Sequence, residues 1–140
     1  MVQKIIFIPF FGMMLLTLAV WVYMFYLRLS FFKRQNVPPQ SVSTTRQWLD
    51  VVPAKLNTPS ENFINLFELP VLFYAVCIYL YVTQQVDGMY LSLAYCFLVF
   101  RIGHSVIHCT YNNVMHRFYF YVISSLSLWI LIIRALTGVV

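Results

Sequence analysis

The chain has 140 residues, of which 61% are hydrophobic and 9% are charged, whereas ordinary soluble domains are roughly 45–50% apolar and about 25% charged. So few charges cannot cover the surface of a soluble domain of this size, and the high hydrophobicity excludes an intrinsically disordered chain. The net charge of +5, with His neutral, comes mainly from one basic loop, which favours a membrane-orientation signal over a nucleic-acid partner. The composition therefore predicts an integral membrane protein.

Four apolar stretches predict four transmembrane helices. The first covers residues 5–27, has no charged residue, and is longer than the roughly 7–15 residues of a signal-peptide core. The next three cover residues 63–82, 89–107 and 118–136, each close to the ~20 residues that cross the hydrocarbon core as a helix. Because none of them alternates polar with apolar residues, transmembrane strands are excluded. We expect an all-α membrane protein, a four-transmembrane-helix bundle that forms one integral membrane domain over residues 1–140.

The long connection at residues 28–61 predicts the orientation of the bundle. It contains several prolines and is expected to hold turns and a short interfacial helix around residues 47–56. Basic residues lie mainly on its side of the membrane, namely Arg28, Lys33, Arg34, Arg46, Lys55 and Arg117, against Lys4 and Arg134 on the other side. The positive-inside rule then places the loop at residues 28–61 in the cytoplasm and both termini on the outer side.

Polar residues inside the spans gather near the predicted cytoplasmic face. Two sets share one helix face each, by their spacing of three or four residues: Glu61, Asn65 and Glu68 on the second helix, and Arg101, His104 and His108 on the third. At 1.5 Å per residue, Glu68 and Arg101 both lie roughly 9 Å below the membrane surface. The two faces are therefore expected at matched depth.

A charged side chain at membrane depth costs on the order of 2.5–3.5 kcal/mol on insertion scales, so these groups need partners. We predict an ion pair between Glu68 and Arg101, within one chain or across a subunit boundary, with Asn65 and His104 completing the hydrogen bonds. Such a pair either holds helices together or forms part of a site that binds something polar.

Two further interpretations concern the same region. His104 and His108, with Glu68 opposite, have the residue types of a two-His, one-carboxylate metal site, although Arg101 on the same face would repel a cation. No metal ligand is therefore assigned. Tyr119 and Tyr121 are interpreted as lipid-facing or interfacial aromatics that need no cofactor.

These residues resemble the MAPEG family, the membrane-associated proteins of eicosanoid and glutathione metabolism. The resemblance covers nearly the whole chain. Its strongest element is the N-x-x-E pair Asn65 and Glu68 at the start of the second helix, followed by Pro70. The third helix, with Phe100-Arg101-Ile-Gly-His104, and the basic start of the fourth, His116-Arg117, are similar too.

The resemblance implies a homotrimer that binds glutathione between subunits near the cytoplasmic face and takes a lipophilic small molecule from the membrane lipids. Candidate cofactor-binding residues are then Arg28, Asn65, Glu68, Arg101, His104 and His108. Arg117 and Arg101 are the candidate catalytic residues, because an arginine near a thiol lowers its pKa and the thiolate is the nucleophile.

Some positions depart from the family pattern. Glu61 stands where active members typically carry an arginine, Leu69 where they often carry a tyrosine, and His104 and His108 replace tyrosines. Exchanging an arginine for a glutamate should weaken the binding of anionic glutathione. Two functions follow: a glutathione-transferase-like or peroxidase-like enzyme acting on a lipophilic electrophile, or a non-catalytic protein of the same fold that binds a lipid or a partner helix.

Overall fold

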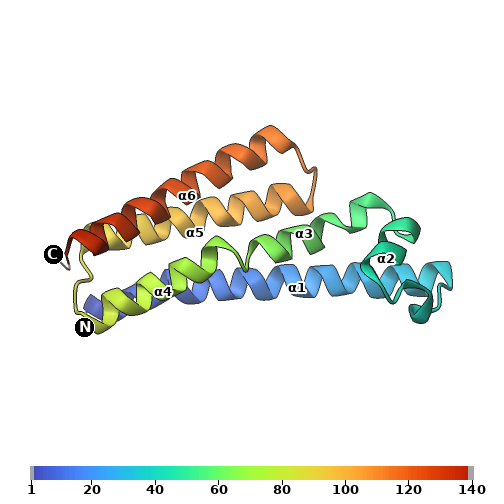
Figure 1. Cartoon of the computed structure of the whole chain (residues 1–140), viewed down its shortest axis with the longest axis horizontal. Helices are drawn as coiled ribbons and strands as arrows, with labels where there is room; N and C mark the ends of the chain where they lie inside the picture. Colours follow the sequence, from blue (N-terminus) through green and yellow to red (C-terminus); the bar gives the residue numbers. More distant parts are fainter. Residues whose placement is uncertain (1, 139–140) are drawn as a thin grey trace.

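The computed structural model describes residues 2–138, and this part of the chain is all-helical (Figure 1). Four helical segments within it are long and apolar enough to cross a membrane: Gln3–Gln35, Ala54–Val82, Gly88–Cys109 and Val114–Thr137. The predicted all-helical class with four candidate spans is therefore confirmed. In chain order the elements are the 3₁₀-helix η1 (Val2–Ile6), α1 (Phe7–Gln35), η2 (Pro39–Val42), α2 (Thr45–Val51), η3 (Ala54–Leu56), α3 (Thr58–Asn65), α4 (Leu69–Val82), α5 (Gly88–Cys109) and α6 (Val114–Thr137).

Helix α1 continues well beyond the apolar stretch that predicted it. It ends at Gln35, and Asn36 follows in the left-handed conformation with φ 50°. Asparagine tolerates that conformation at a helix C-terminus, and Pro38 cannot continue the helix. The start of the segment expected to be a loop at residues 28–61 is therefore helical.

The second predicted span is interrupted. Helix α3 ends at Asn65, α4 begins at Leu69, and Glu68 between them has φ −94° and ψ −101°. Pro70 accounts for the interruption, because it has no N–H to offer the carbonyl of residue 66 and its ring would collide with that carbonyl in a continuous helix. The predicted second span, residues 63–82, therefore lies within the candidate span Ala54–Val82, whose helix breaks just before Pro70.

Short helices form the connection between α1 and α3. Helix α2 begins with a capping box, in which the Thr44 hydroxyl accepts from the Gln47 N–H and the Gln47 side chain accepts from the Thr44 N–H. Together with η3, α2 covers most of the stretch expected to hold an interfacial helix, residues 47–56. Figure 1 shows α2 at the end of the bundle opposite to both marked termini.

Helices α5 and α6 form an antiparallel hairpin. Asp87 caps α5 by accepting from the Tyr90 N–H, and Asn113 caps α6 by accepting from the N–H groups of Met115 and His116. At the far end, Arg134 donates to both carboxylate oxygens of Asp87. The α5–α6 hairpin is thus held together by the short connection at one end and by the Arg134–Asp87 ion pair at the other.

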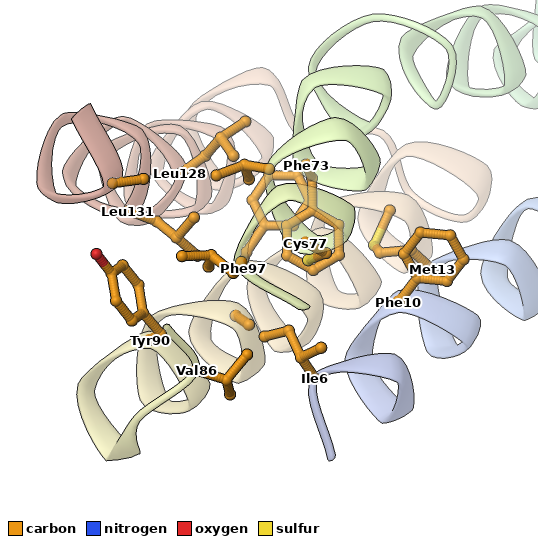
Figure 2. Close-up of a cluster of buried hydrophobic side chains, with 14 of the residues drawn as sticks. Ile6, Phe10, Met13, Phe73, Cys77, Val86, Tyr90, Phe97, Leu128 and Leu131 are labelled. Atoms are coloured by element: carbon orange, nitrogen blue, oxygen red, sulfur yellow. The ribbon is translucent and has the colours of Figure 1, made fainter. Parts of the chain in front are cut away.

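The apolar core lies at the end of the bundle that carries the termini. Figure 2 shows side chains from α1, α4, α5 and α6 converging there, with the rings of Phe73 and Phe97 stacked 4.6 Å apart. Leu128 and Leu131 from α6 and Met13 from α1 are fully buried in the same cluster. The buried ionisable side chains of Arg101, His104 and His108 lie farther along α5, toward the other end of the bundle.

Candidate functional site

A polar cavity of about 210 Å³ lies where α3, α5 and α6 meet, away from the apolar core. Its lining combines polar groups with two apolar residues of the α6 start: Asn65, His104, Arg117, Tyr121, Val114 and Phe118. Three of the residues singled out from the sequence, Asn65, His104 and Arg117, therefore face one space. Val114 and Phe118 are 63% and 54% exposed, so the cavity is bordered by apolar surface.

Arg117 is positioned by the turn that precedes α6. Asn112 adopts a left-handed conformation with φ 46°, and Asn113 then caps the helix. Arg117 lies in the first turn, where its Nη1 atom donates to Oδ1 of Asn112 at 2.9 Å. The local sequence Asn112-Asn113 thus holds the guanidinium beside the cavity while leaving its other N–H groups available.

His104 presents a hydrogen-bond acceptor. Its Nδ1 atom lies 3.1 Å from the carbonyl oxygen of Arg117. Because a carbonyl only accepts, we assign the proton to Nδ1, which leaves Nε2 with a lone pair. The residue is 3% exposed, and Nε2 has no hydrogen-bond partner among residues 2–138. His104 therefore has a free acceptor to offer a ligand.

Arg101 is the most deeply buried charge of the described region, with 1% of its surface exposed. Its guanidinium carbon lies 5.0 Å from the centre of the Tyr121 ring and 5.5 Å from that of Phe97. Within the part of the chain that the structure describes, none of its three side-chain nitrogens has a hydrogen-bond partner. Aromatic faces stabilise the cation only in part, and the guanidinium keeps hydrogen-bond donors that no described residue accepts.

The predicted ion pair between Glu68 and Arg101 is not formed within the protomer. The salt bridges between described residues are Arg134–Asp87 and His108–Glu61. Glu68 is exposed, because the interruption before Pro70 takes its backbone out of the helix whose face it was expected to share. The version of the prediction in which the pair crosses a subunit boundary stays a prediction.

Glu61 instead contacts His108, a partnership that the sequence reasoning missed. His108 Nε2 lies 3.4 Å from Oε2 of Glu61. Helices α3 and α5 pack against each other in antiparallel directions, so Glu61 lies opposite His108 and, four residues on, Asn65 shares the cavity with His104. The polar faces of α3 and α5 therefore meet as expected over Glu61 and Asn65. Glu68 is not part of this contact, because it lies in the break between α3 and α4.

Tyr121 is a second residue that the sequence reasoning missed. It lines the cavity and lies under the Arg101 guanidinium, so it is an exception among the aromatic residues, most of which were expected to face lipid or the interface. Its spacing of four residues from Arg117 was the available signal, since such residues share a helix face.

Arg28 lies in a different place. Its Nη2 atom donates to the Ser60 hydroxyl at 3.0 Å, and its guanidinium carbon is 4.7 Å from the centre of the Trp48 ring. A separate pocket of about 220 Å³ is lined by Arg28, Val42, Ser43, Thr44 and Trp48. Within one protomer, Arg28 is therefore not assembled with the residues around Arg117.

The alternative metal site is not assembled within residues 2–138, where no group of three or more His, Cys, Asp or Glu side chains is arranged to hold a metal ion. His108 turns to Glu61, and Glu68 is exposed.

A family model matches residues 6–137, nearly the whole chain, and its description is the MAPEG family. The chain belongs to the MAPEG family. Searches among curated proteins and among solved structures gave no match. MAPEG proteins commonly bind glutathione and typically form trimers, and the family includes glutathione-dependent transferases and peroxidases as well as non-catalytic members. The family and the four candidate spans make this an integral multi-pass membrane protein.

The residues of this MAPEG chain fit a thiol with carboxylate groups. Arg117 offers free N–H donors to an anion. The guanidinium of Arg101, which has no hydrogen-bond partner among the described residues, lies over the ring of Tyr121, and Tyr121 lines the cavity. His104 Nε2 and the Asn65 side chain add an acceptor and an amide for the peptide groups of such a ligand. The exposed Glu61 is the opposing feature, because its negative charge lies one turn from Asn65.

Proposed function

We propose that this MAPEG protein is a membrane glutathione-dependent transferase or peroxidase that acts on a lipophilic electrophile or lipid peroxide. The observation that carries the proposal is the joining of polar and apolar features in one cavity. Arg117, His104 and Asn65 line it, and the exposed side chains of Val114 and Phe118 border it. A charged thiol and a lipophilic acceptor can react only where a polar site borders an apolar surface.

Bound glutathione would supply the nucleophilic sulfur for transfer or reduction. Arg117 and Arg101 favour the thiolate, because nearby positive charge stabilises the anionic form of a thiol. His104 accepts a hydrogen bond at Nε2 and so orients a donor of the bound molecule. The apolar surface beside the cavity lets an acceptor arrive from the acyl chains and keeps water away from the sulfur.

We propose that the active form is a homotrimer, with Glu68 and Arg28 contributing to sites shared between subunits. The non-helical backbone at residues 66–68 supports this, because lipid does not satisfy free backbone groups. Phe67, 58% exposed, and Glu68 next to it need cover at membrane depth. In the proposed trimer a neighbouring subunit covers these residues. The carboxylate of Glu68 then forms an ion pair with the buried Arg101 of the adjacent subunit.

The proposed orientation places the cavity near the cytoplasmic leaflet. The basic loop at residues 28–61 and Arg117 lie at that side, and both termini lie at the opposite one. Figure 1 agrees with an even number of crossings, because both marked termini lie at one end of the bundle. Glutathione would then arrive from the cytoplasm.

The proposal is tested with purified protein in detergent or lipid nanodiscs. We expect a glutathione-dependent rise in melting temperature and turnover with a chlorinated aromatic acceptor or a lipid hydroperoxide. Arg117→Ala should abolish turnover, whereas Arg46→Ala, on the surface of α2, should leave it unchanged. Absence of both the thermal shift and turnover in the unmodified protein would overturn the proposal.

The exposed carboxylate of Glu61 favours a second candidate, a non-catalytic protein of the same fold that binds a lipid or a partner helix. An acid beside the cavity repels the carboxylates of glutathione. This alternative predicts that lipid, and no thiol, co-purifies with the protein and that Arg117→Ala changes lipid content without any loss of chemistry. Mass spectrometry of the purified protein distinguishes the two.

A further inference from the structure

Glu61 and His108 join the water-exposed surface to the interior beside the cavity. The contact from His108 Nε2 to Glu61 Oε2 is 3.4 Å. The side chain of Glu61 is 61% exposed, whereas that of His108 is 2% exposed. The pair therefore connects the surface of the protomer with its interior.

The hydrogen-bond roles in this pair are fixed by its chemistry. An ionised carboxylate only accepts, so Nε2 of His108 carries the proton and donates it to Glu61. Nδ1 is left as an unprotonated acceptor, which is buried and has no partner among the described residues. A buried polar atom without a partner calls for an explanation. A carboxylate that orients an imidazole in this way prepares the opposite nitrogen to accept a proton.

His108 is held close to the cavity by the packing of α3 on α5. Asn62 links the helices, since its Oδ1 accepts from the Ser105 hydroxyl at 3.3 Å and its Nδ2 donates to Cys109 Sγ at 3.5 Å. The ring centre of His108 lies 5.6 Å from that of His104, which lines the cavity.

The charged and titratable groups around His108 come from three helices. They are Glu61 on α3, Arg117 on α6, and His104 on its own helix. Glu61 is the one anion in this set, so it is the group among them to which a proton passes.

We propose that the Glu61–His108 pair is the route by which the thiol proton leaves the site, an inference that rests on the proposed function. The thiol proton passes to His108 Nδ1, so that the S–H bond breaks as an N–H bond forms. The Nε2–H bond then breaks, and the proton forms an O–H bond on Glu61. The products are a thiolate and a protonated carboxyl group, which releases its proton to solvent. Exchange with water restores the starting tautomer. His108 relays the proton, and Glu61 is a positioning residue that also receives it.

The test measures thiolate formation directly. Unmodified protein and variants in nanodiscs are mixed with glutathione, and the ultraviolet absorbance of the thiolate is followed by stopped flow without an acceptor. We expect His108→Gln to slow thiolate formation about 100-fold, the lower range for a positioned proton-transfer group, with the dissociation constant of glutathione changed less than about threefold. Added imidazole should restore the rate in proportion to its concentration.

Glu61→Gln provides a second variant, and because Glu61 is exposed its replacement leaves the packing intact. We expect it to slow thiolate formation less than His108→Gln does, because the amide cannot take the proton but the imidazole remains. His116→Gln and Asp50→Asn are matched controls at exposed positions, and their rates should equal that of the unmodified protein.

Two results would overturn the inference. Thiolate formation at the unmodified rate in both His108→Gln and Glu61→Gln removes the proton route while leaving the proposed function intact. Failure of the unmodified protein to bind glutathione or form a thiolate removes the proposed function and the inference together.

Discussion

Arg134, near the end of α6, forms a two-point ion pair with Asp87, the residue that caps the start of α5. The guanidinium carbon of Arg134 also lies 4.0 Å from the centre of the Tyr90 ring. The pair therefore ties the two ends of the hairpin and reinforces a helix cap at the same point.

This pair predicts an acid-sensitive hairpin. The hydrogen bonds from Arg134, then that from the Tyr90 N–H, hold the pKa of the Asp87 carboxyl well below its usual range. A lowered pKa in the folded state stabilises the protein above the unfolded value of about 3.9, and this stabilisation is lost as the pH falls toward the folded value. We expect Asp87→Asn to lower the melting temperature in detergent at pH 7, and the difference from the unmodified protein to shrink below about pH 4. A constant difference from pH 7 to pH 3 would contradict this prediction.

The second prediction concerns Glu68 and Arg101. Since the pair is not formed within one protomer, we expect their coupling to depend on assembly. A double-mutant cycle of Glu68→Gln and Arg101→Met should give about 0.5–3 kcal/mol of coupling in the proposed trimer and a smaller coupling in dissociated subunits. Unfolding is followed at high and low protein concentration in detergent. Equal coupling at both concentrations would mean that the pair lies within one chain.

The third prediction separates binding from chemistry at Glu61. Glu61→Arg removes the anion beside the cavity and adds a cation, so it should tighten glutathione binding about 10-fold, or ~1.4 kcal/mol. It also removes the acceptor at the end of the proton route, so turnover should fall. Calorimetry measures the first effect and initial rates the second. Asp50→Arg makes the same charge change on α2 and should alter neither, and a rise in turnover with Glu61→Arg would count against the proton route.

The fourth prediction concerns the contact between α5 and α6 beside the site. A Cβ atom on Gly103 would collide with Cε1 of Phe120, whose ring also packs against Phe100. Gly103→Ala should therefore destabilise the protein by about 1–3 kcal/mol, the usual cost of overpacking.

Gly12→Ala is the matched control for this substitution. Its Cβ would meet the mobile end of Leu98, and about 1 kcal/mol of gained helix propensity offsets the contact. Unfolding of both variants in detergent provides the comparison. Similar stability losses would show that the fit of the Phe120 ring is not the cause.

Hydropathy predicted where the membrane is crossed, but it could not predict where the helices end. The apolar stretch stops before Arg28, whereas α1 continues to Gln35 because nothing interrupts the backbone until Asn36 turns left-handed. In the second span Pro70 was visible, but its effect falls on the residues before it, so the break lies at residues 66–68 and includes Glu68.

The site was predictable as two polar faces and not as a set of contacts. Spacing alone placed Asn65 and His104 on facing sides, and both line the cavity. The contact between Glu61 and His108 follows from the antiparallel register of α3 and α5, and no periodicity within either helix specifies that register. Charge complementarity favoured Glu68 with Arg101, but Pro70 takes the backbone of Glu68 out of the helix, and the two side chains form no ion pair within the protomer.

The contacts between α3 and α5 depend on the rotational position of each side chain around its helix axis as well as on which residues are present. Each residue of an α-helix turns the chain by about 100°. One residue inserted between Arg101 and His108 would swing the imidazole away from its carboxylate while every side chain named above remained in the sequence. A related chain that keeps all of these residues but carries such an insertion would therefore have lost the arrangement.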